Sequence, residues 1–498
     1  MAPIPRTNAD SHTGHRGGMT ANLTHRPRLR LAVPMVLGLM LTACSAFDSV
    51  RTTMFGGGST QGQPGYVKGF LGEVVADEPR AALTGKEVLS GGGNAADAAV
   101  AIGLSLAVTL PSRAGLGGGG ACIAYTADRH GTGNGVPEAI MFVPPPVRSV
   151  GGGDRPAAVP MLARGLYLLH VRHGSLSFES LITKADDLAR RGVPVSRALA
   201  RDLVLVAGPV FADPAARAVF GLGGAPLAEG QTMLQPALAA TLAQLRASGV
   251  GDLYQGVLAR RVAQVSPSAG VPIGLADLWA ALPAVSAPVM VSFGEDKVAF
   301  PPTDGGLGAA AAFMALKSQP ADVQGAWLRS LAAAARWRAG GANSDQVLNG
   351  QLVAPAAVPL YPASTTFATL DPNGNAVVCA VTMNNLFGTG RMVPGVGFLA
   401  AASPAAVTPP LLASGLAWRE SNHAFHAEAG GSGQAGAALA AAVALSNSLR
   451  SGQPMQSLAP EPGRANVITC GRYLPGSESH CAAAADPRES GMTAGGGS

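Results

Sequence analysis

The side chains best suited to chemistry in this chain are three consecutive hydroxyls, Ser364, Thr365 and Thr366. A serine or threonine hydroxyl can attack a carbonyl carbon and form an acyl intermediate when a base takes up its proton. The same residue types are common at the start of a strand, where their hydroxyls satisfy nearby backbone groups. The hydroxyls alone therefore leave two interpretations, a nucleophile for acyl transfer and an ordinary strand start.

A β-hairpin is the element that would position these hydroxyls. The segments 366–370 and 376–382 are rich in β-branched and apolar residues, which favours strands. Between them lies Asp371-Pro372-Asn373-Gly374, a sequence typical of a tight turn. The pattern predicts that the hydroxyls stand at the mouth of the first strand.

The segments before the hairpin predict a mixed architecture. A short strand is expected at 73–76, followed by helices at 78–89 and 94–110. The second helix is apolar on nearly every face, so we expect it inside the core. A further strand is expected at 121–125, after the glycine-rich run 116–120. That run lacks the residues of a phosphate-binding loop, which argues against a nucleotide site.

Residues 160–340 are rich in alanine and leucine and are broken by proline and glycine. They predict a layer of helices, two of them at 179–191 and 235–247, with no site of their own. No internal repeat is evident in the chain.

The composition indicates a folded protein with a large core. Of its 498 residues, 47% are hydrophobic and 13% are charged, which argues against disorder. The formal charge of +5 is concentrated before Cys44, and the remainder carries 30 basic against 29 acidic residues. A nearly neutral body makes nucleic acid an unexpected partner.

The first 44 residues resemble a secretory leader. A basic segment, 26–30, precedes the apolar run 31–41, which is shorter than the roughly 20 residues of a membrane-spanning helix. The run ends in Leu41-Thr42-Ala43-Cys44, which is similar to a bacterial lipobox. We therefore expect a lipid anchor on Cys44, a flexible tether over 45–69, and a lipoprotein facing the periplasm. Ser45 suggests the outer membrane. The alternatives are an ordinary cleaved signal or a start at Met19.

Four further cysteines remain. Cys122 and Cys379 lie in apolar, strand-like segments, where buried thiols are expected. Cys470 and Cys481 flank a Gly/Pro/Ser loop, and an oxidising compartment would favour a disulfide between them. The histidine pairs 170/173 and 423/426 lack a third ligand, so no metal is expected. No cofactor is expected either.

Several stretches carry a resemblance to the γ-glutamyltranspeptidase family, whose members are N-terminal-nucleophile hydrolases made as self-cleaving proenzymes. The start of the family's small subunit resembles Asp371, Gly374-Asn375-Ala376-Val377, Thr382-Met383-Asn384, Phe387-Gly388-Thr389-Gly390 and Pro394-Gly395. The start of its large subunit resembles Asp77-Glu78-Pro79, the run 92–100 and the glycine run 115–120. The end of the family's sequence resembles Asp486-Pro487-Arg488.

The resemblance implies an α+β fold, the four-layer αββα sandwich of these hydrolases. It also implies a large part over 70–363 and a small part over 364–498, which remain together after the chain cuts itself. Backbone cleavage frees the α-amine of the nucleophile, and this amine, with a pKa near 8, can accept the hydroxyl proton at neutral pH.

The resemblance also suggests which residue is the nucleophile. With Asp371 and Gly374 in register, Ser364 falls where the family has its threonine, Thr365 takes the second threonine and Thr366 replaces a histidine. A cut before Thr365 requires deleting one residue and exchanges the two faces of the strand. Ser364 is therefore preferred, with Thr365 as the alternative.

Other residues take their expected roles from the family. Thr382 matches a residue that bonds the nucleophile, and Asn384 matches one that bonds the substrate. Gly430 and Gly431 match the glycine pair whose amides form the oxyanion hole, a contribution usually worth several kcal/mol. Ser414 is a weaker match to a serine near the substrate carboxylate.

Two charge-binding positions depart from the family. Val143 stands in place of the arginine that binds the substrate carboxylate. Pro404-Ala405-Ala406, which contains no acid, stands in place of the run that supplies an acid for the substrate ammonium. Each lost charge-assisted bond is worth roughly 1.5 to 3 kcal/mol, so glutathione should bind poorly unless Arg113 or Arg148 substitutes.

The sequence thus predicts a self-processing γ-glutamyltranspeptidase-like acyltransferase or amidohydrolase acting on a small amide or peptide. Its partners would be its own cleaved subunit and, through the lipid, a membrane. An acylase of β-lactam-type or other amides would differ only in its pocket. The alternative from another class is a catalytically inactive envelope lipoprotein that keeps the fold as a binding or scaffolding body.

Overall fold

The structure, a computed structural model, describes residues 69–127, 135–151, 153–341, 343–351, 353–355, 357–358, 360–454, 459–475 and 481–495. The predicted leader with Cys44, and the predicted tether apart from Gly69, lie outside these residues. None of the helices in the described ranges has the length and apolar character needed to cross a membrane.

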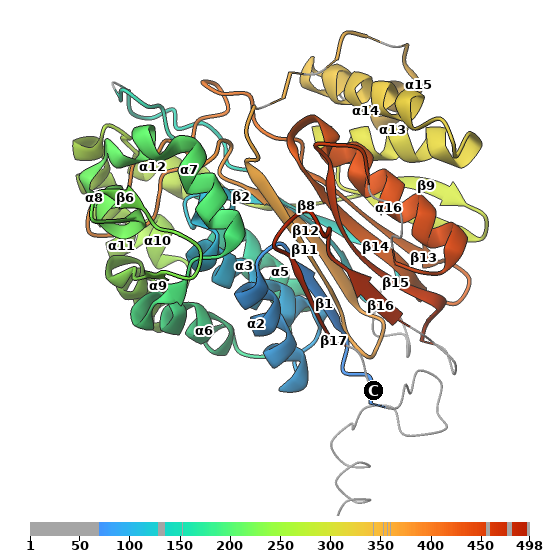
Figure 1. The fold of residues 1–498 in the computed structure, drawn as a ribbon, viewed down its shortest axis with the longest axis horizontal. Coiled ribbons are helices and arrows are strands. Elements are labelled where there is room, and N and C mark those ends of the chain that lie inside the picture. The colour runs from blue at the N-terminus through green and yellow to red at the C-terminus, as the bar shows by residue number, and fades with distance from the viewer. Residues whose placement is uncertain are drawn as a thin grey trace, which may run out of the picture. The chain divides into compact units, whose positions relative to one another are not determined.

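The first sheet contains the predicted hairpin near its centre (Figure 1). All its neighbouring strands are antiparallel. Its seven strands are, in spatial order, β17 (Met492–Gly495), β1 (Glu73–Ala76), β11 (Ser364–Leu370), β12 (Ala376–Thr382), β2 (Gly119–Tyr125), β3 (Glu138–Phe142) and β8 (Ala284–Ser286).

The hairpin β11–β12 is confirmed, with Ser364 opposite Thr382 and Leu370 opposite Ala376. The first strand begins two residues earlier than predicted, so all three hydroxyls lie inside the sheet. The turn is held by Asp371, whose carboxylate accepts bonds from the backbone amides of Asn373 and Asn375 and, at 3.2 Å, from that of Ala95. Burial nevertheless raises the pKa of the Asp371 carboxyl.

The second sheet has six antiparallel strands. They are β16 (Cys481–Ala484), β15 (Arg464–Leu474), β14 (Ala424–Ser432), β13 (Ala413–Arg419), β10 (Asp296–Phe300) and β9 (Val289–Phe293). The prediction of helices throughout 160–340 is wrong for 284–300, which supplies β8, β9 and β10. In β9, buried and exposed residues begin by alternating, and Gly294 at φ +62° turns the chain into β10.

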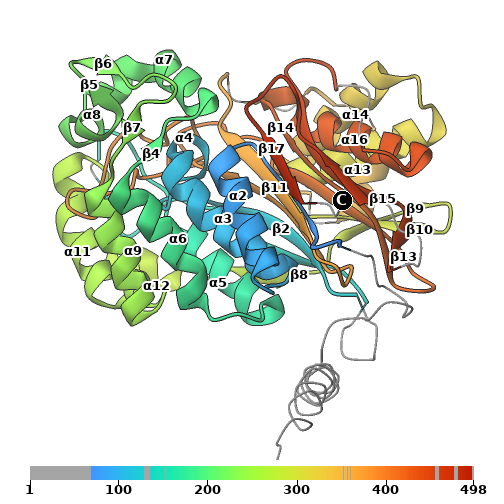
Figure 2. The same cartoon turned by 60° about the horizontal axis from the view of Figure 1, so that its bottom comes forward.

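Helices pack on one face of each sheet, as the views in Figures 1 and 2 show. The first sheet is covered by α2 (Pro79–Ser90), α3 (Ala95–Thr109) and α5 (Leu162–His173). Further helices surround these: α4 (Pro111–Ala114), α6 (Phe178–Arg191), α7 (Arg197–Phe211), α8 (Pro214–Phe220), α9 (Pro236–Ser248), α10 (Asp252–Gln255), α11 (Val257–Val265) and α12 (Leu275–Ala280).

The second sheet is covered by α13 (Asp304–Ser318) and α16 (Ala437–Ser451), with α14 (Val323–Arg338) and α15 (Ser344–Asn349) packed beside α13. Two small pairs complete the described structure, β4 (Val193–Pro194) with β7 (Thr232–Met233) and β5 (Gly221–Leu222) with β6 (Ala225–Pro226). Short 3₁₀ turns lie at Ser266–Ala269 and Gln434–Gly436.

The prediction that α3 lies in the core is confirmed, because every one of its residues is buried. An apolar helix in this position must satisfy its first amides locally. The Asn94 side-chain oxygen does so by accepting a bond from the Asp97 amide, and the Asn94 amide in turn donates to the Asp97 carboxylate. The mixed α+β fold with two antiparallel sheets is likewise confirmed.

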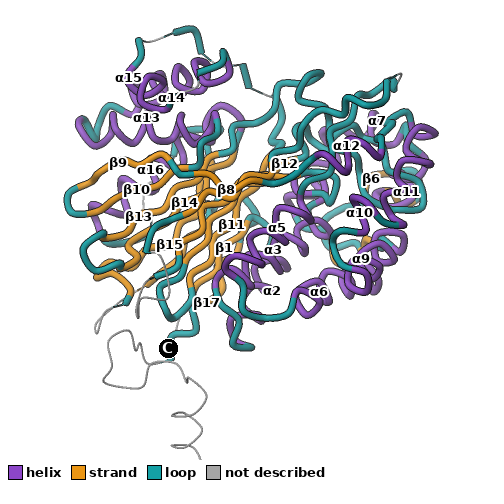
Figure 3. The backbone as a smooth tube through the Cα atoms, turned by 180° about the vertical axis from the view of Figure 1, so that it is seen from behind, coloured by secondary structure: helices purple, strands orange, loops and turns teal. Residues whose placement is uncertain are grey.

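The two sheets face each other across an apolar layer. Val75, Ile123 and Ala368 of the first sheet pack with Leu416 and Ile468 of the second. Figure 3 shows the strands of both sheets between helices on either side. Along β11, side chains with even numbers therefore face the second sheet, and those with odd numbers face the helices.

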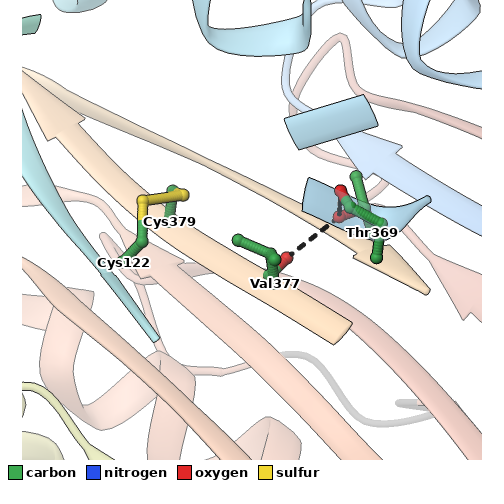
Figure 4. The surroundings of a disulfide bond; sticks show 5 residues. Cys122, Thr369, Val377 and Cys379 are labelled. Carbon is green, nitrogen blue, oxygen red and sulfur yellow. Dashed lines mark hydrogen bonds between the residues drawn. A yellow bond between two sulfur atoms is a disulfide. The ribbon is translucent and has the colours of Figure 1, made fainter. Parts of the chain in front are cut away.

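Two disulfides join strands. Cys470 and Cys481 are bonded between β15 and β16, the pair that the sequence suggested. The expectation of free thiols at Cys122 and Cys379 is wrong, because these residues lie opposite each other on β2 and β12 and are bonded (Figure 4). Their Cα atoms are 4.0 Å apart, a separation that only the pairing of strands 257 residues apart creates.

Candidate active site

The Ala363–Ser364 peptide bond lies at the start of β11 and is buried. On one side of β11, β1 pairs with it only as far as Ala76 opposite Phe367. The chain then leaves the sheet, and the carboxylate of Asp77 takes the place of a paired strand. Asp77 accepts a 3.2 Å bond from the Thr366 amide and a 2.7 Å bond from the Thr365 hydroxyl.

The alternation of the strand separates the two candidate nucleophiles. Phe367 belongs to the core beneath the helices and Ala368 to the layer between the sheets. Thr365 therefore points to the helix side, where Asp77 holds its hydroxyl. Ser364 points between the sheets, and its buried hydroxyl has no hydrogen-bond partner among the described residues.

The carbonyl before Ser364 is engaged by Thr382. The Thr382 hydroxyl donates a 2.7 Å bond to the Ala363 oxygen, and it accepts a 2.7 Å bond from the Asn384 amide. Such a donor withdraws electron density from the carbonyl and stabilises negative charge that develops on its oxygen. The arrangement therefore favours attack on the Ala363 carbonyl carbon.

Asn384 is held in a backbone conformation that few residues adopt, with φ at +61°. Its side-chain amide donates to the carbonyl oxygens of Ala402, at 2.9 Å, and Pro144, at 3.4 Å. Its side-chain oxygen is buried and has no partner among the described residues. That oxygen can accept a bond from a ligand.

The predicted oxyanion glycines lie at the end of β14 and face opposite ways. A Cβ built on Gly430 would come within 2.6 Å of the Thr366 Cβ, so Gly430 faces β11. A Cβ on Gly431 would meet the Ala437 carbonyl at 2.0 Å, so Gly431 faces α16. Both positions exclude a larger residue, and the oxyanion role stays a prediction.

Ser414, on β13, lies opposite Gly430 and is buried, and its hydroxyl has no partner within the described ranges. It therefore shares the layer between the sheets with Ser364 and Thr366. Its role beside a substrate carboxylate stays a prediction.

The glycine run 116–120 packs against β12 rather than β11. Gly119 pairs with Thr382, and a Cβ on Gly118 would lie 2.2 Å from the Thr382 carbonyl oxygen. The run thus supports the strand that carries Thr382, one strand away from Ser364.

Two site residues had no role in the sequence analysis. Asp77 belongs to the run that carried the family resemblance, but it lies 288 residues before Thr365, and no sequence pattern predicts the bond between them. Asn466, on β15, gave no signal, because it lies within a strand of mostly apolar residues. Its amide nitrogen donates to Asp77 at 2.7 Å and to both oxygens of Thr366 at 3.0 Å. The polar link between the two sheets is visible only in the fold.

A pocket of about 480 Å³ adjoins the site. Thr382 and Asn384 form part of its wall, as do Val143 and Pro404, the two positions that depart from the family. The other lining residues are Met141, Pro302, Thr303, Asp304, Trp337, Arg338, Pro409, Pro410 and Leu412.

Neither arginine considered as a substitute reaches this pocket. Arg113 is buried in a two-pronged ion pair with Asp202, with both bonds at 2.8 Å. Arg148 is exposed and does not line the pocket. The arginine at the pocket is Arg338, which the sequence analysis missed because it lies at the end of a helix about 195 residues from Val143 in a stretch without a motif.

No group of three side chains in the described ranges is arranged to hold a metal ion. Of the two predicted histidine pairs, His173 bonds Glu138 and His426 bonds Asp296 at 2.7 Å. These contacts explain the histidines as members of structural pairs.

Comparisons with known proteins bear on the family of the chain. Residues 81–337, just over half of the chain, match the family described as gamma-glutamyltranspeptidase. The chain is 29% identical over 255 residues to a glutathione hydrolase proenzyme of Escherichia coli K12, covering 48% of this chain and 44% of that protein. It is 33% identical over 227 residues to the acylase ACY 1 proenzyme of Pseudomonas sp. SE83, covering 42% and 41%. The chain thus spans less than half the length of these relatives.

Among solved structures, a cephalosporin acylase from Bacillus halodurans superposes with a TM-score of 0.67 at 19% identity, over 89% of this chain and 99% of that one. This likeness shows a shared fold. Because the family match extends over more than half of the sequence, the chain belongs to the gamma-glutamyltranspeptidase family.

Proposed function

We propose that this protein is a self-processing amidohydrolase or acyltransferase with the αββα sandwich of the N-terminal-nucleophile hydrolases, and that Ser364 is its nucleophile. The observation that carries the proposal is the bond from Thr382 to the Ala363 carbonyl, beside a Ser364 hydroxyl that bonds no other group in the described part of the chain. The relatives named proenzymes support a maturation step.

Maturation converts the Ala363–Ser364 peptide bond into an ester and then into two chain ends. The Ser364 oxygen attacks the Ala363 carbonyl carbon, the Ala363–Ser364 C–N bond breaks, and an ester forms while the α-amine takes up a proton. Water then hydrolyses the ester. The products are an Ala363 carboxylate and a free Ser364 amine, so the parts 70–363 and 364–498 become separate chains.

Turnover uses the same groups. The freed amine accepts the Ser364 hydroxyl proton as the oxygen attacks a substrate amide. Thr382, and in the predicted role the amides of Gly430 and Gly431, stabilise the oxyanion. An amine leaves, and water or a second amine takes the acyl group. The absence of charged side chains at Val143 and Pro404, where the family has an arginine and an acid, supports a substrate less zwitterionic than glutathione.

A reducing SDS gel of the wild type, Ser364→Ala and Thr365→Ala tests the proposal. We expect two fragments from the wild type and from Thr365→Ala, and one uncut chain from Ser364→Ala. Mass spectrometry should place the new amino terminus at Ser364. An uncut wild type would contradict the proposal and would favour the inactive binding or scaffolding body.

For location, we propose the bacterial cell envelope, as a lipoprotein anchored through Cys44 and facing the periplasm. The two disulfides support this, because such bonds persist in oxidising compartments. A Cys44→Ser form that still partitions with membranes would contradict the anchor.

A further inference from the structure

We infer that the pocket beside Thr382 binds an uncharged, apolar acyl group, such as an arylacetyl group, and that Trp337 selects it. The inference rests on the proposed function, because it treats this pocket as the acyl side of the Ser364 centre. An apolar acyl group would take the place of the zwitterionic γ-glutamyl group for which the family has charged side chains.

The position of the pocket supports an acyl role. Thr382 lines the pocket and also bonds the Ala363 carbonyl at 2.7 Å. Asn384 lines it with a side-chain oxygen that has no partner in the described part of the chain. A ligand in the pocket would therefore have its reacting carbonyl next to Ser364, and Asn384 could accept a bond from an amide N–H.

The charges of the pocket neutralise each other. Among the described residues that line it, only Asp304 and Arg338 are charged, and the Arg338 Nε lies 2.6 Å from the Asp304 carboxylate. The remaining guanidinium nitrogens of Arg338 donate to the carbonyl oxygens of Pro409 and Ala357. Asp304 also accepts a bond from the Gly305 amide. A charged ligand would have to displace these bonds, or enter without a counter-charge.

The rest of the wall offers few donors to a carboxylate. Four of its residues are prolines, which have no backbone N–H, namely Pro302, Pro404, Pro409 and Pro410. Met141, Val143 and Leu412 add apolar surface.

Trp337, half-buried near the end of α14, is the aromatic side chain among the described lining residues, and a ring can pack against it. The volume of about 480 Å³ suits a small acyl group.

Binding to the uncut Ser364→Ala chain tests the inference without requiring catalysis. The probes are phenylacetamide, L-glutamine and glutaramic acid, which share an amide and differ in the charge of the acyl group. Calorimetry should show phenylacetamide binding at least about tenfold more tightly than either charged amide, because only its ring gains from apolar burial. Equal or tighter binding of L-glutamine would overturn the inference.

Substitutions in the same background identify the selecting residue. Trp337→Ala should weaken phenylacetamide about tenfold or more, and Trp337→Phe should retain most of the affinity. Trp279→Ala is the matched control, because Trp279 is 67% exposed on α12 and does not line the pocket. An unchanged affinity in a folded Trp337→Ala protein would also overturn the inference.

The failure of the proposed function has a separate signature. It would appear as an uncut wild type on the reducing gel, whereas the acyl preference is measured on a chain that is never cut. Val143→Arg adds a converse test, since an unpaired guanidinium at the rim should raise the affinity for glutaramic acid relative to phenylacetamide.

Discussion

The hydroxyl of Thr382 lies 2.7 Å from the carbonyl oxygen of Ala363, directly across the hairpin from Ser364. Because a carbonyl oxygen can only accept, the hydroxyl donates in this contact. It is itself fixed by the Asn384 amide, which leaves its proton directed at the carbonyl. The peptide bond proposed to break is therefore polarised before any substrate arrives.

Removing this donor should slow maturation. Thr382→Val keeps the size of the side chain and deletes the hydroxyl, so the developing oxyanion on Ala363 loses its bond. We expect self-cleavage to slow by roughly 10²–10³-fold, measured as the loss of uncut chain on a reducing gel over time. Thr369→Val is the matched control, since Thr369 lies on the paired strand β11 and its hydroxyl donates to the Ala95 carbonyl. Equal rates for both variants would contradict the role of Thr382.

The Cys122–Cys379 disulfide should hold the two matured parts together covalently. Cys122 lies before the proposed cut and Cys379 after it, whereas Cys470 and Cys481 both lie after it. A cleaved protein should therefore run as one band on a non-reducing gel and as two bands after reduction. Cys122→Ser should give two bands under both conditions. Two bands from the unreduced wild type would contradict the bond.

Asp77 should stabilise the start of β11. Its carboxylate accepts bonds from the Thr365 hydroxyl, the Thr366 amide and the Asn466 side chain. Asp77→Asn replaces one of the two acceptor oxygens with an NH₂ group. At least one of the three donors then loses its acceptor, which should lower the free energy of unfolding by about 1–3 kcal/mol. Urea unfolding of the uncut Ser364→Ala chain should show this loss. Asn466→Asp together with Asp77→Asn should recover part of it, because the donor and acceptor exchange places.

Stability should decrease as the pH rises, because of two buried glutamates. Burial raises the pKa of Glu73 to about 7, although Lys86 opposes the shift. Burial between the sheets raises the pKa of Glu428 well above its usual range, and the nearby Thr369 amide opposes this only in part. The folded protein thus keeps protons on these carboxyls that the unfolded chain releases near pH 4.3. The contribution of the two protonated glutamates to stability is therefore complete below that pH. For Glu73 it is lost as the pH approaches 7.

Glu73→Gln should flatten the decline between about pH 4.5 and 7, and Glu428→Gln should raise stability most at pH 8. Urea midpoints across this range provide the measurement. Glu420→Gln serves as the control, because the Glu420 side chain is 68% exposed. A wild type whose midpoint rises from pH 5 to 8 would contradict the assignment.

Much of the scaffold could be predicted from local pattern. The hairpin, the buried helix α3 and the first strand followed from apolar periodicity and turn residues, which depend on neighbours in sequence. The strands β9 and β10 were missed because they are five residues each within an alanine-rich stretch, and β13, which joins β10 to the rest of the sheet, comes more than a hundred residues later.

The sequence by itself determined the family of this protein and the small group of hydroxyls that includes its candidate nucleophile, because both depend on residue types in a given order. Only the tertiary structure gave Ser364 and Thr365 different surroundings, since the pleat of β11 turns one toward the second sheet and the other toward Asp77. It also paired Cys122 with Cys379 and brought Asp304, Trp337 and Arg338 to the pocket. Such contacts join segments far apart in the chain, and the spacing of residues in the sequence does not predict them.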